Sequence, residues 1–261
     1  MKSLHQIDLI KEIQQNPIPF IGQRSFKLLQ VFLLPFDINC EFDVPDADQP
    51  FLNEYPSIEQ EISSTYDIRL GTRSWPSPLK YYCEDERARF QLATNFILDY
   101  EKKYPNPNQA DYKLKLKDPS TIFELETSLG MIGFRPEMYF GTSELACLRA
   151  YIDGYFFFKD YFKLRHSSFE VKLLEFIKPY KTVNNADFKT WDRNYRWEWD
   201  FAVYGTNERH AIPKFMQDIQ EYTQTTFSVT INNTEIKLDW TNYLSWWNKS
   251  MNELYESFVA K

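Results

Sequence analysis

Residues 135–155 read RPEMYFGTSELACLRAYIDGY, and residues 16–36 read NPIPFIGQRSFKLLQVFLLPF. Each stretch has proline second and glycine seventh, and aromatic or aliphatic residues then recur at matching places. The offset between them is 135 − 16 = 119 residues, and it also aligns residues far downstream. One offset that holds over about 90 residues indicates an internal duplication, in a unit too long for a solenoid repeat. The aligned pairs are Pro17/Pro136, Phe20/Tyr139, Ile21/Phe140, Gly22/Gly141, Phe26/Leu145, Leu29/Leu148, Phe32/Tyr151, Leu33/Ile152, Phe36/Tyr155, Phe96/Phe215 and Asp99/Asp218.

Three helices are expected in each copy of this unit. The first ends at the proline, because a residue before proline is pushed out of the helical region. The glycine turns the chain into the second helix, whose apolar residues keep helical spacing. Capping boxes, which satisfy the first backbone amides of a helix, predict where the first helix starts. The expected helices are 3–15 and 121–132, capped by Ser3 with Gln6 and by Thr121 with Glu124, then those capped near Ser25 and Ser143, and finally 86–103 and 208–222.

The remaining segments predict a small amount of β structure. The strictly alternating YKLKLK, residues 112–117, predicts a short strand with lysines outward. The segment 227–240 predicts a hairpin around two asparagines, which tolerate positive φ, and an aromatic helix is expected over about 241–259. The chain is therefore predicted to be mainly α with minor β (α+β), with the two copies forming a pseudo-dimer. The predicted parts are a first copy over 1–105, a linker with the strand over 106–119, a second copy over 120–224, and the hairpin and helix over 225–261.

Composition excludes several function classes. The chain has only seven glycines, whereas phosphate-cradling loops consume glycine, so a nucleotide-binding fold and a nucleotide cofactor are not expected. The formal net charge of −7 disfavours nucleic-acid binding, which rests on Lys and Arg neutralising phosphates. An acidic chain instead suits a basic protein partner.

Cysteine usage and hydropathy favour a cytoplasmic protein. The three cysteines, Cys40, Cys83 and Cys147, are far apart and odd in number, which indicates reduced thiols rather than a disulfide framework. Polar residues interrupt the N-terminal segment MKSLHQIDLIKEIQQ, so no signal peptide is expected. No apolar stretch approaches the ~18 residues of a membrane span.

Negative charge is concentrated in one segment of the first copy. Nine carboxylates lie between Asp37 and Asp67, with no lysine or arginine among them, whereas the matching residues 156–186 carry six basic and three acidic side chains. A solvated acidic loop and a docking surface for a basic partner both fit, and a calcium loop fits less well because its glycine and terminal glutamate are missing. Interleaved apolar residues favour docking, since apolar anchors ringed by charge build tight interfaces. The predicted partner-binding residues are Asp43, Asp46, Asp48, Phe51, Glu54, Tyr55, Glu59 and Glu61.

The repeated motif itself is interpreted as a scaffold. Its structural residues are Pro17, Gly22, Pro136, Tyr139 and Gly141. Copy two also carries Arg135 and Arg149, which copy one replaces with Asn16 and Gln30. A duplicated active site would keep its charges, so a helix–turn–helix scaffold is favoured. The alternative is an anion site made by Arg135 and Arg149 in copy two only.

No catalytic residue and no metal site is predicted. The three histidines, His5, His166 and His210, lack any zinc-binding spacing, and the serines beside His166 lack a nucleophile-elbow context. The aromatic stretch WDRNYRWEWD, residues 191–200, is interpreted as core or interface. The alternative is a metal-dependent hydrolase using Glu198, Asp200, Asp192 or His210.

The stretch RPEMYFGTSELACLRAYIDGY resembles a motif of small bacterial proteins that carry an RPxMYxG turn, a helix ending near DGY and then an asparagine–tryptophan stretch, here Asn194 and Trp197. The likeness covers residues 121–222. Some of those proteins resemble immunity-type proteins encoded beside polymorphic toxins. The resemblance implies a non-enzymatic inhibitor that binds a basic toxin in the cytoplasm. A metal-dependent hydrolase and an acidic nucleic-acid mimic stay as alternatives, and the oligomeric state is left open.

Overall fold

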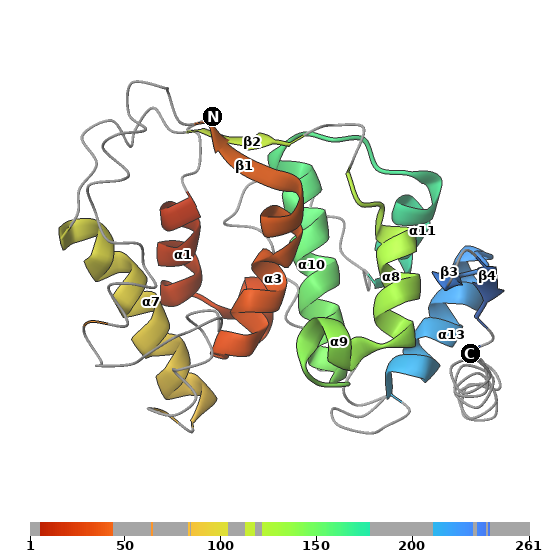
Figure 1. Cartoon of the computed structure of the whole chain (residues 1–261), viewed down its shortest axis with the longest axis horizontal. Helices are drawn as coiled ribbons and strands as arrows, with labels where there is room; N and C mark the ends of the chain where they lie inside the picture. Colours follow the sequence, from red (N-terminus) through yellow and green to blue (C-terminus); the bar gives the residue numbers. More distant parts are fainter. Residues whose placement is uncertain are drawn as a thin grey trace, which may run out of the picture. The chain divides into compact units, whose positions relative to one another are not determined.

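In the residues that the computed structural model describes (Figure 1), the chain is mainly helical and has two short two-stranded antiparallel sheets. The structure describes residues 6–43, 64, 83, 85–103, 113–117, 122–177, 211–231, 234–238 and 240. Two compact units divide the chain, one made of residues 1–122 with 153–158 and the other of 123–152 with 159–261. The predicted fold class, mainly α with minor β, is therefore confirmed.

Unit 1 is built on a short helix–turn–helix. Pro17 ends the first helix and starts the next, and Gly22 ends that second helix at φ 72°, in the left-handed region that favours glycine. Ser25 then caps the third helix, its hydroxyl oxygen accepting a 3.3 Å hydrogen bond from the N–H of Leu28. The elements are α1 (Gln6–Gln15), α2 (Ile18–Ile21), α3 (Phe26–Asn39), β1 (Cys40–Asp43), α7 (Glu86–Lys103) and β2 (Lys113–Leu116).

The core of unit 1 is rich in phenylalanine. Phe20, Phe32 and Phe36 are buried, and their rings contact Phe157 at centroid distances of 5.6 to 6.0 Å. This close packing requires a residue without a side chain at Gly154, because a Cβ there would lie 2.0 Å from the carbonyl oxygen of Phe32. Residues 153–158 of α10 (Leu145–Tyr161) thus belong to the core of unit 1.

The linker strand pairs with the residues that follow α3. Strand β2 is antiparallel to β1, and its register places Lys115 opposite Glu41 and Lys113 opposite Asp43. The predicted strand over 112–117 is thus confirmed, at Lys113–Leu116. The backbone register therefore pairs each acidic residue of β1 with a lysine of β2.

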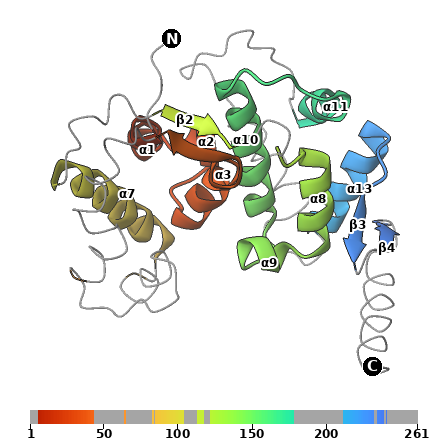
Figure 2. The same ribbon diagram turned by 45° about the horizontal axis from the view of Figure 1, so that its top comes forward.

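Unit 2 begins with a helix–turn–helix of the same form. Its first helix ends at Phe134, and the next ends at Gly141, which has φ 68°. In Figures 1 and 2, α8, α13 and the β3–β4 hairpin lie side by side, and α8 contacts both α13 and β3. The elements are α8 (Leu125–Phe134), α9 (Pro136–Phe140), α10, α11 (Ser168–Ile177), α13 (Ala211–Thr223), β3 (Ser228–Ile231) and β4 (Thr234–Lys237).

Two glycines let the C-terminal hairpin approach α8. A Cβ at Gly130 would lie 2.9 Å from the carbonyl oxygen of Ser228, and one at Gly133 would lie 2.8 Å from the ring of Trp240. The hairpin was predicted, and its register leaves two residues, 232 and 233, to connect Ile231 with Thr234. The predicted helix over 241–259 lies outside the described residues.

Helix bounds in the two units match at the offset found in the sequence. Shifting α1 by 119 residues gives 125–134, which is α8, and shifting α3 gives 145–158 within α10. The glycines at positive φ, Gly22 and Gly141, are related by the same shift.

One expectation for unit 2 was wrong. Helix α8 starts at Leu125, because Glu124 is extended and its side chain makes no cap, so the expected capping box at Thr121 and Glu124 does not start this helix. Helix α11 was not predicted at all.

Candidate functional site

Of the eight residues of the predicted partner surface, the structure describes one. The backbone of Asp43 lies in β1, opposite Lys113 of β2. The other seven residues lie outside the described part of the chain: Asp46, Asp48, Phe51, Glu54, Tyr55, Glu59 and Glu61. The described residues before and after this segment show how the chain is held on either side of it.

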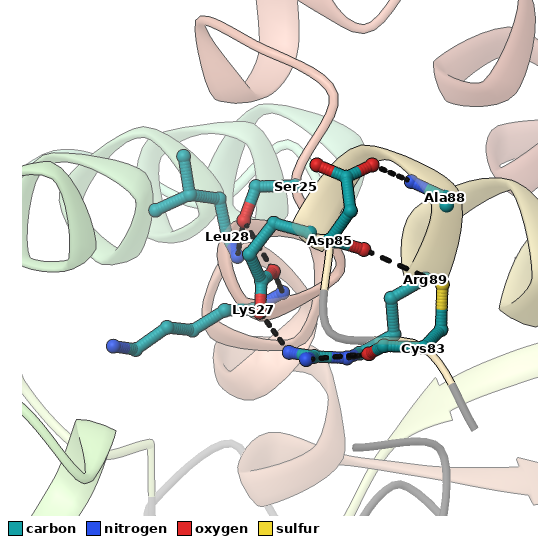
Figure 3. A network of polar contacts seen from close by, with 8 residues as sticks. Ser25, Lys27, Leu28, Cys83, Asp85, Ala88 and Arg89 are labelled. Atoms are coloured by element: carbon teal, nitrogen blue, oxygen red, sulfur yellow. Dashed lines mark hydrogen bonds and ion pairs between the residues drawn. The ribbon is translucent and has the colours of Figure 1, made fainter. Parts of the chain in front are cut away.

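At its far side, the segment is followed by a polar network that joins two helix N-termini (Figure 3). The carboxylate of Glu86, the first residue of α7, accepts hydrogen bonds from the hydroxyl of Ser25 (2.9 Å) and the backbone N–H of Lys27 (3.2 Å). Unpaired amides give a helix N-terminus partial positive charge, so a carboxylate is stabilised there. Glu86 thereby fastens the start of α7 to the start of α3.

The same network holds the chain just before α7 (Figure 3). Arg89, which is 8% exposed, pairs with Glu86 and donates to the carbonyl oxygen of Cys83 from Nε (3.0 Å) and Nη2 (2.7 Å). Asp85 caps α7 by accepting a 2.7 Å bond from the N–H of Ala88. One buried guanidinium thus fixes the point at which the chain enters α7.

The opposite end of α3 is held by the linker. Lys117 donates from Nζ to the carbonyl oxygens of Asp37 (3.2 Å) and Ile38 (3.0 Å), and its backbone N–H donates to Asn39. The last carbonyls of a helix carry partial negative charge, which an ammonium group stabilises. Burial raises the pKa of the neighbouring Cys40 thiol to about 12, although Lys117 opposes that shift, so this cysteine stays a neutral thiol.

The five motif residues lie at the two helix–turn–helix corners. Pro17 and Pro136 are buried at the start of α2 and α9, and Gly22 and Gly141 end those helices. Tyr139 is 37% exposed on α9, where partial burial raises its pKa and the charge of Arg135 opposes that shift.

The two arginines of the predicted anion site have different surroundings. Arg149 is fully buried in α10, with its guanidinium carbon 6.0 Å from the centre of the Phe215 ring. Arg135 is partly exposed at the α8–α9 corner, where it lies over the Phe134 ring and donates to Sδ of Met138 at 3.7 Å. Of the two arginines, only Arg135 is accessible to ions from solvent. An anion site made by Arg135 and Arg149 remains a prediction.

His166 lies in a cluster of charges that the sequence analysis did not find. Its Nε2 is 3.1 Å from Oδ1 of Asp160, and its Nδ1 is 3.4 Å from Oε2 of Glu170. Contacts with Asp160 and then Glu170 raise the pKa of His166 to about 9 against the effect of burial. A signal for this cluster was present, since Ser167 and Glu170 have capping-box spacing.

This geometry does not suit His166 to activate a serine. A general base needs a free ring nitrogen near neutral pH, whereas both nitrogens of His166 face carboxylates that favour the imidazolium form. The hydroxyl of the adjacent Ser167 instead caps α11, accepting a 3.2 Å bond from the N–H of Glu170.

The residues of the hydrolase alternative are not described. Glu198, Asp200, Asp192 and His210 all lie outside the described residues, as do His5 and the aromatic stretch 191–200. Among the residues that are described, no group of three His, Cys, Asp or Glu side chains is placed to hold a metal ion. In the same ranges, no helix has the length and apolar character needed to cross a membrane.

No protein-family model matches the chain, and neither a curated protein nor a solved structure matches it.

Proposed function

We propose that this protein is a non-enzymatic inhibitor of the immunity type, which binds a basic bacterial toxin in the cytoplasm and blocks its active site. The observation that carries the proposal is the charge of residues 37–67, where nine carboxylates stand without a single lysine or arginine. Such a surface speeds association with a basic partner through electrostatic steering, and its apolar residues supply the anchors that give affinity.

The anchoring of α3 supports this assignment. The chain leaves α3 through β1, which β2 pairs and Lys117 fastens, and it returns at Cys83, which Arg89 holds. Glu86 ties that return point to the other end of α3. Helix α3 has 14 residues, or about 20 Å at ~1.5 Å per residue. The described residues on either side of the acidic segment, Asp43 and Cys83, are therefore both held by neighbouring elements.

The same proposal includes the origin of the fold. The two units derive from a tandem duplication that forms a pseudo-dimer, and only the first copy acquired the acidic surface. Coincident helix bounds and paired positive-φ glycines at the 119-residue offset support this history. In the second copy, the matching residues 156–186 carry a net charge of +3, from six basic and three acidic side chains. One partner needs only one binding surface, so only one of the two copies has to carry it. The two copies are therefore expected to diverge.

The test is capture of the partner by the tagged full-length protein from its own host. Two variants carry five reversals to lysine each. The interface variant changes Asp46, Asp48, Glu54, Glu59 and Glu61, and the control variant changes the exposed residues Glu12, Glu137, Glu175, Glu221 and Glu235. Both variants have the same net charge. A difference in binding between them therefore shows that the position of the acidic residues matters, and not only the total charge.

The expected partner is a basic protein that high salt releases, that the control variant retains, and that arrests growth when it is expressed without the inhibitor. With purified proteins, the interface reversals are expected to weaken binding by about a hundredfold or more, as the loss of several interface charges does. Equal affinity of the two variants would reject the acidic surface. A captured protein that is harmless when expressed alone would reject the toxin assignment.

A further inference from the structure

The connection between α10 and α11 is a turn that is closed at both ends. At its start, Lys163 adopts φ 53°, and the N–H of Leu164 returns to the carbonyl oxygen of Lys159 at 2.9 Å. At its end, Ser167 and Glu170 form a reciprocal capping box, in which the N–H of Ser167 donates to Oε2 of Glu170 at 2.9 Å. The turn therefore brings the end of α10 against the first residues of α11.

Four charged side chains meet inside this turn. Glu170 is almost fully buried, with 3% of its side chain exposed, and its carboxylate contacts Nζ of Lys159 at 3.1 Å. On its other side it faces His166, which also contacts Asp160. Two carboxylates thus stand against one ammonium group and one imidazole.

We propose that protonated His166 is a latch that holds the start of α11 against the end of α10, and that this latch opens when the histidine loses its proton at alkaline pH. The neutral ring can donate to only one of its two carboxylates. The other carboxylate then loses a charge-assisted contact, and for the buried Glu170 such a loss is costly.

The surroundings of the latch set the direction of its pH response. In the described chain, the ionisable groups acting on His166 are Asp160 from α10 and Glu170 from α11, while Lys159 shares the Glu170 carboxylate. Helix α13 meets α11 elsewhere, through the Phe215 and Phe176 rings and the carbonyl of Thr223, which accepts from Lys172.

The pKa of His166 is raised in the folded protein, from 6.5 to about 9. Its contribution to stability is therefore complete below pH 6.5 and disappears as the pH rises through about 9.

The first experiment is an NMR titration of the imidazole signals in the full-length protein, which has only three histidines. H166Q identifies the signal of His166 by its disappearance. The expected midpoint is about 9. In D160N the midpoint should fall by about one unit or more, because a charged partner is lost. E235Q, at an exposed residue of β4, is the control and should leave the midpoint unchanged. A wild-type midpoint at or below 6.5 would overturn the proposal.

The second experiment follows opening directly, by hydrogen exchange of the amides in 163–172. After correction for the intrinsic effect of pH, their protection is expected to fall about tenfold between pH 7 and pH 10, as in a local opening. In H166Q protection should already be low at pH 7 and should not depend on pH. Protection that is constant in the wild type, or that falls equally in H166Q, would show that His166 is not a latch. H166Q and D160N leave the buried Glu170 in place, so the test does not depend on a variant that removes the core of the turn.

Discussion

The hydroxyl of Ser25 donates a 2.9 Å hydrogen bond to the carboxylate of Glu86, 61 residues later in the chain. Its oxygen simultaneously accepts from the N–H of Leu28, 3.3 Å away, and so caps α3. One buried hydroxyl therefore serves both the start of α3 and its connection to α7. Both roles depend on the same side chain, which makes them testable by one substitution.

Ser25→Ala is expected to lower the free energy of unfolding by about 1–2 kcal/mol, because the helix loses its cap and Glu86 loses a donor. The measurement is urea denaturation at pH 7. Gln30→Ala on the exposed side of α3 is the control, since it leaves the cap and Glu86 in place. The control should stay within about 0.5 kcal/mol of the wild type. Equal losses in the two variants would contradict the double role of Ser25.

Local signals in the sequence predicted much of the scaffold. Helix α7 spans Glu86–Lys103 as expected, and the turns at Gly22 and Gly141 follow from proline and glycine at fixed spacing. These features depend on backbone preferences of a few neighbouring residues, which a sequence displays directly. The start of α8 was misjudged because Thr121 and Glu124 have capping-box spacing, although only the structure shows that Glu124 is extended.

The contacts that distinguish the units could not be predicted in the same way. The bonds from Arg89 to Cys83 and from Ser25 to Glu86 depend on how α3 and α7 pack. The pairing of His166 with Asp160 depends on a non-glycine residue, Lys163, adopting a positive φ. The Ser167–Glu170 spacing did indicate the start of α11, and this signal was missed.

Gly154→Ala is expected to destabilise the protein by about 1–3 kcal/mol, as overpacking of a tight contact does. Alanine is a better helix former than glycine by about 1 kcal/mol, so propensity alone predicts the opposite sign. The added Cβ would lie 2.0 Å from the carbonyl oxygen of Phe32, and α10 must shift to avoid it. Thermal and urea unfolding measure the sign, with the exposed Gln30→Ala as a control on α3. A stabilised Gly154→Ala variant would show that the two helices are further apart.

At Gly141, a substitution is expected to lower the stability through backbone strain rather than through packing. Its φ is 68°, and an added Cβ would meet no atom within 4 Å. Gly141→Ala is expected to cost about 1–2 kcal/mol because an L-residue is strained in this region. Gly141→Asn should cost clearly less, since asparagine tolerates the left-handed region. Calorimetry of both variants checks the order, and an equal loss for alanine and asparagine would argue for a contact instead of strain.

Glu170 gives the protein an acid-dependent stability. Burial opposes its ionisation, but contacts with His166, the N–H of Ser167 and Lys159 lower its pKa from 4.5 to about 2. The folded-state pKa is depressed, so the contribution of Glu170 is complete above pH 4.5 and is lost as the pH falls toward 2.

Glu170→Gln should therefore be less stable than the wild type at pH 7, by about 3 kcal/mol or more, since it leaves buried cations without their carboxylate. The difference should narrow as the pH approaches 2. Urea denaturation between pH 2.5 and 7 measures this convergence, with Glu175→Gln on the exposed face of α11 as the control. A difference that does not depend on pH would mean that Glu170 acts by packing and not by charge.

The glycines of α8 also decide where the C-terminal hairpin docks. Among the described residues, two helices lie at matching places, α1 and α8, and there is one β-hairpin, β3–β4. At the 119-residue offset, Gly130 and Gly133 correspond to Lys11 and Gln14. Side chains at those places obstruct the approach that α8 permits, and Gln14 is already engaged with Thr94 and Asn95 of α7. During folding, the hairpin can therefore dock on α8, whereas the corresponding face of α1 does not admit it.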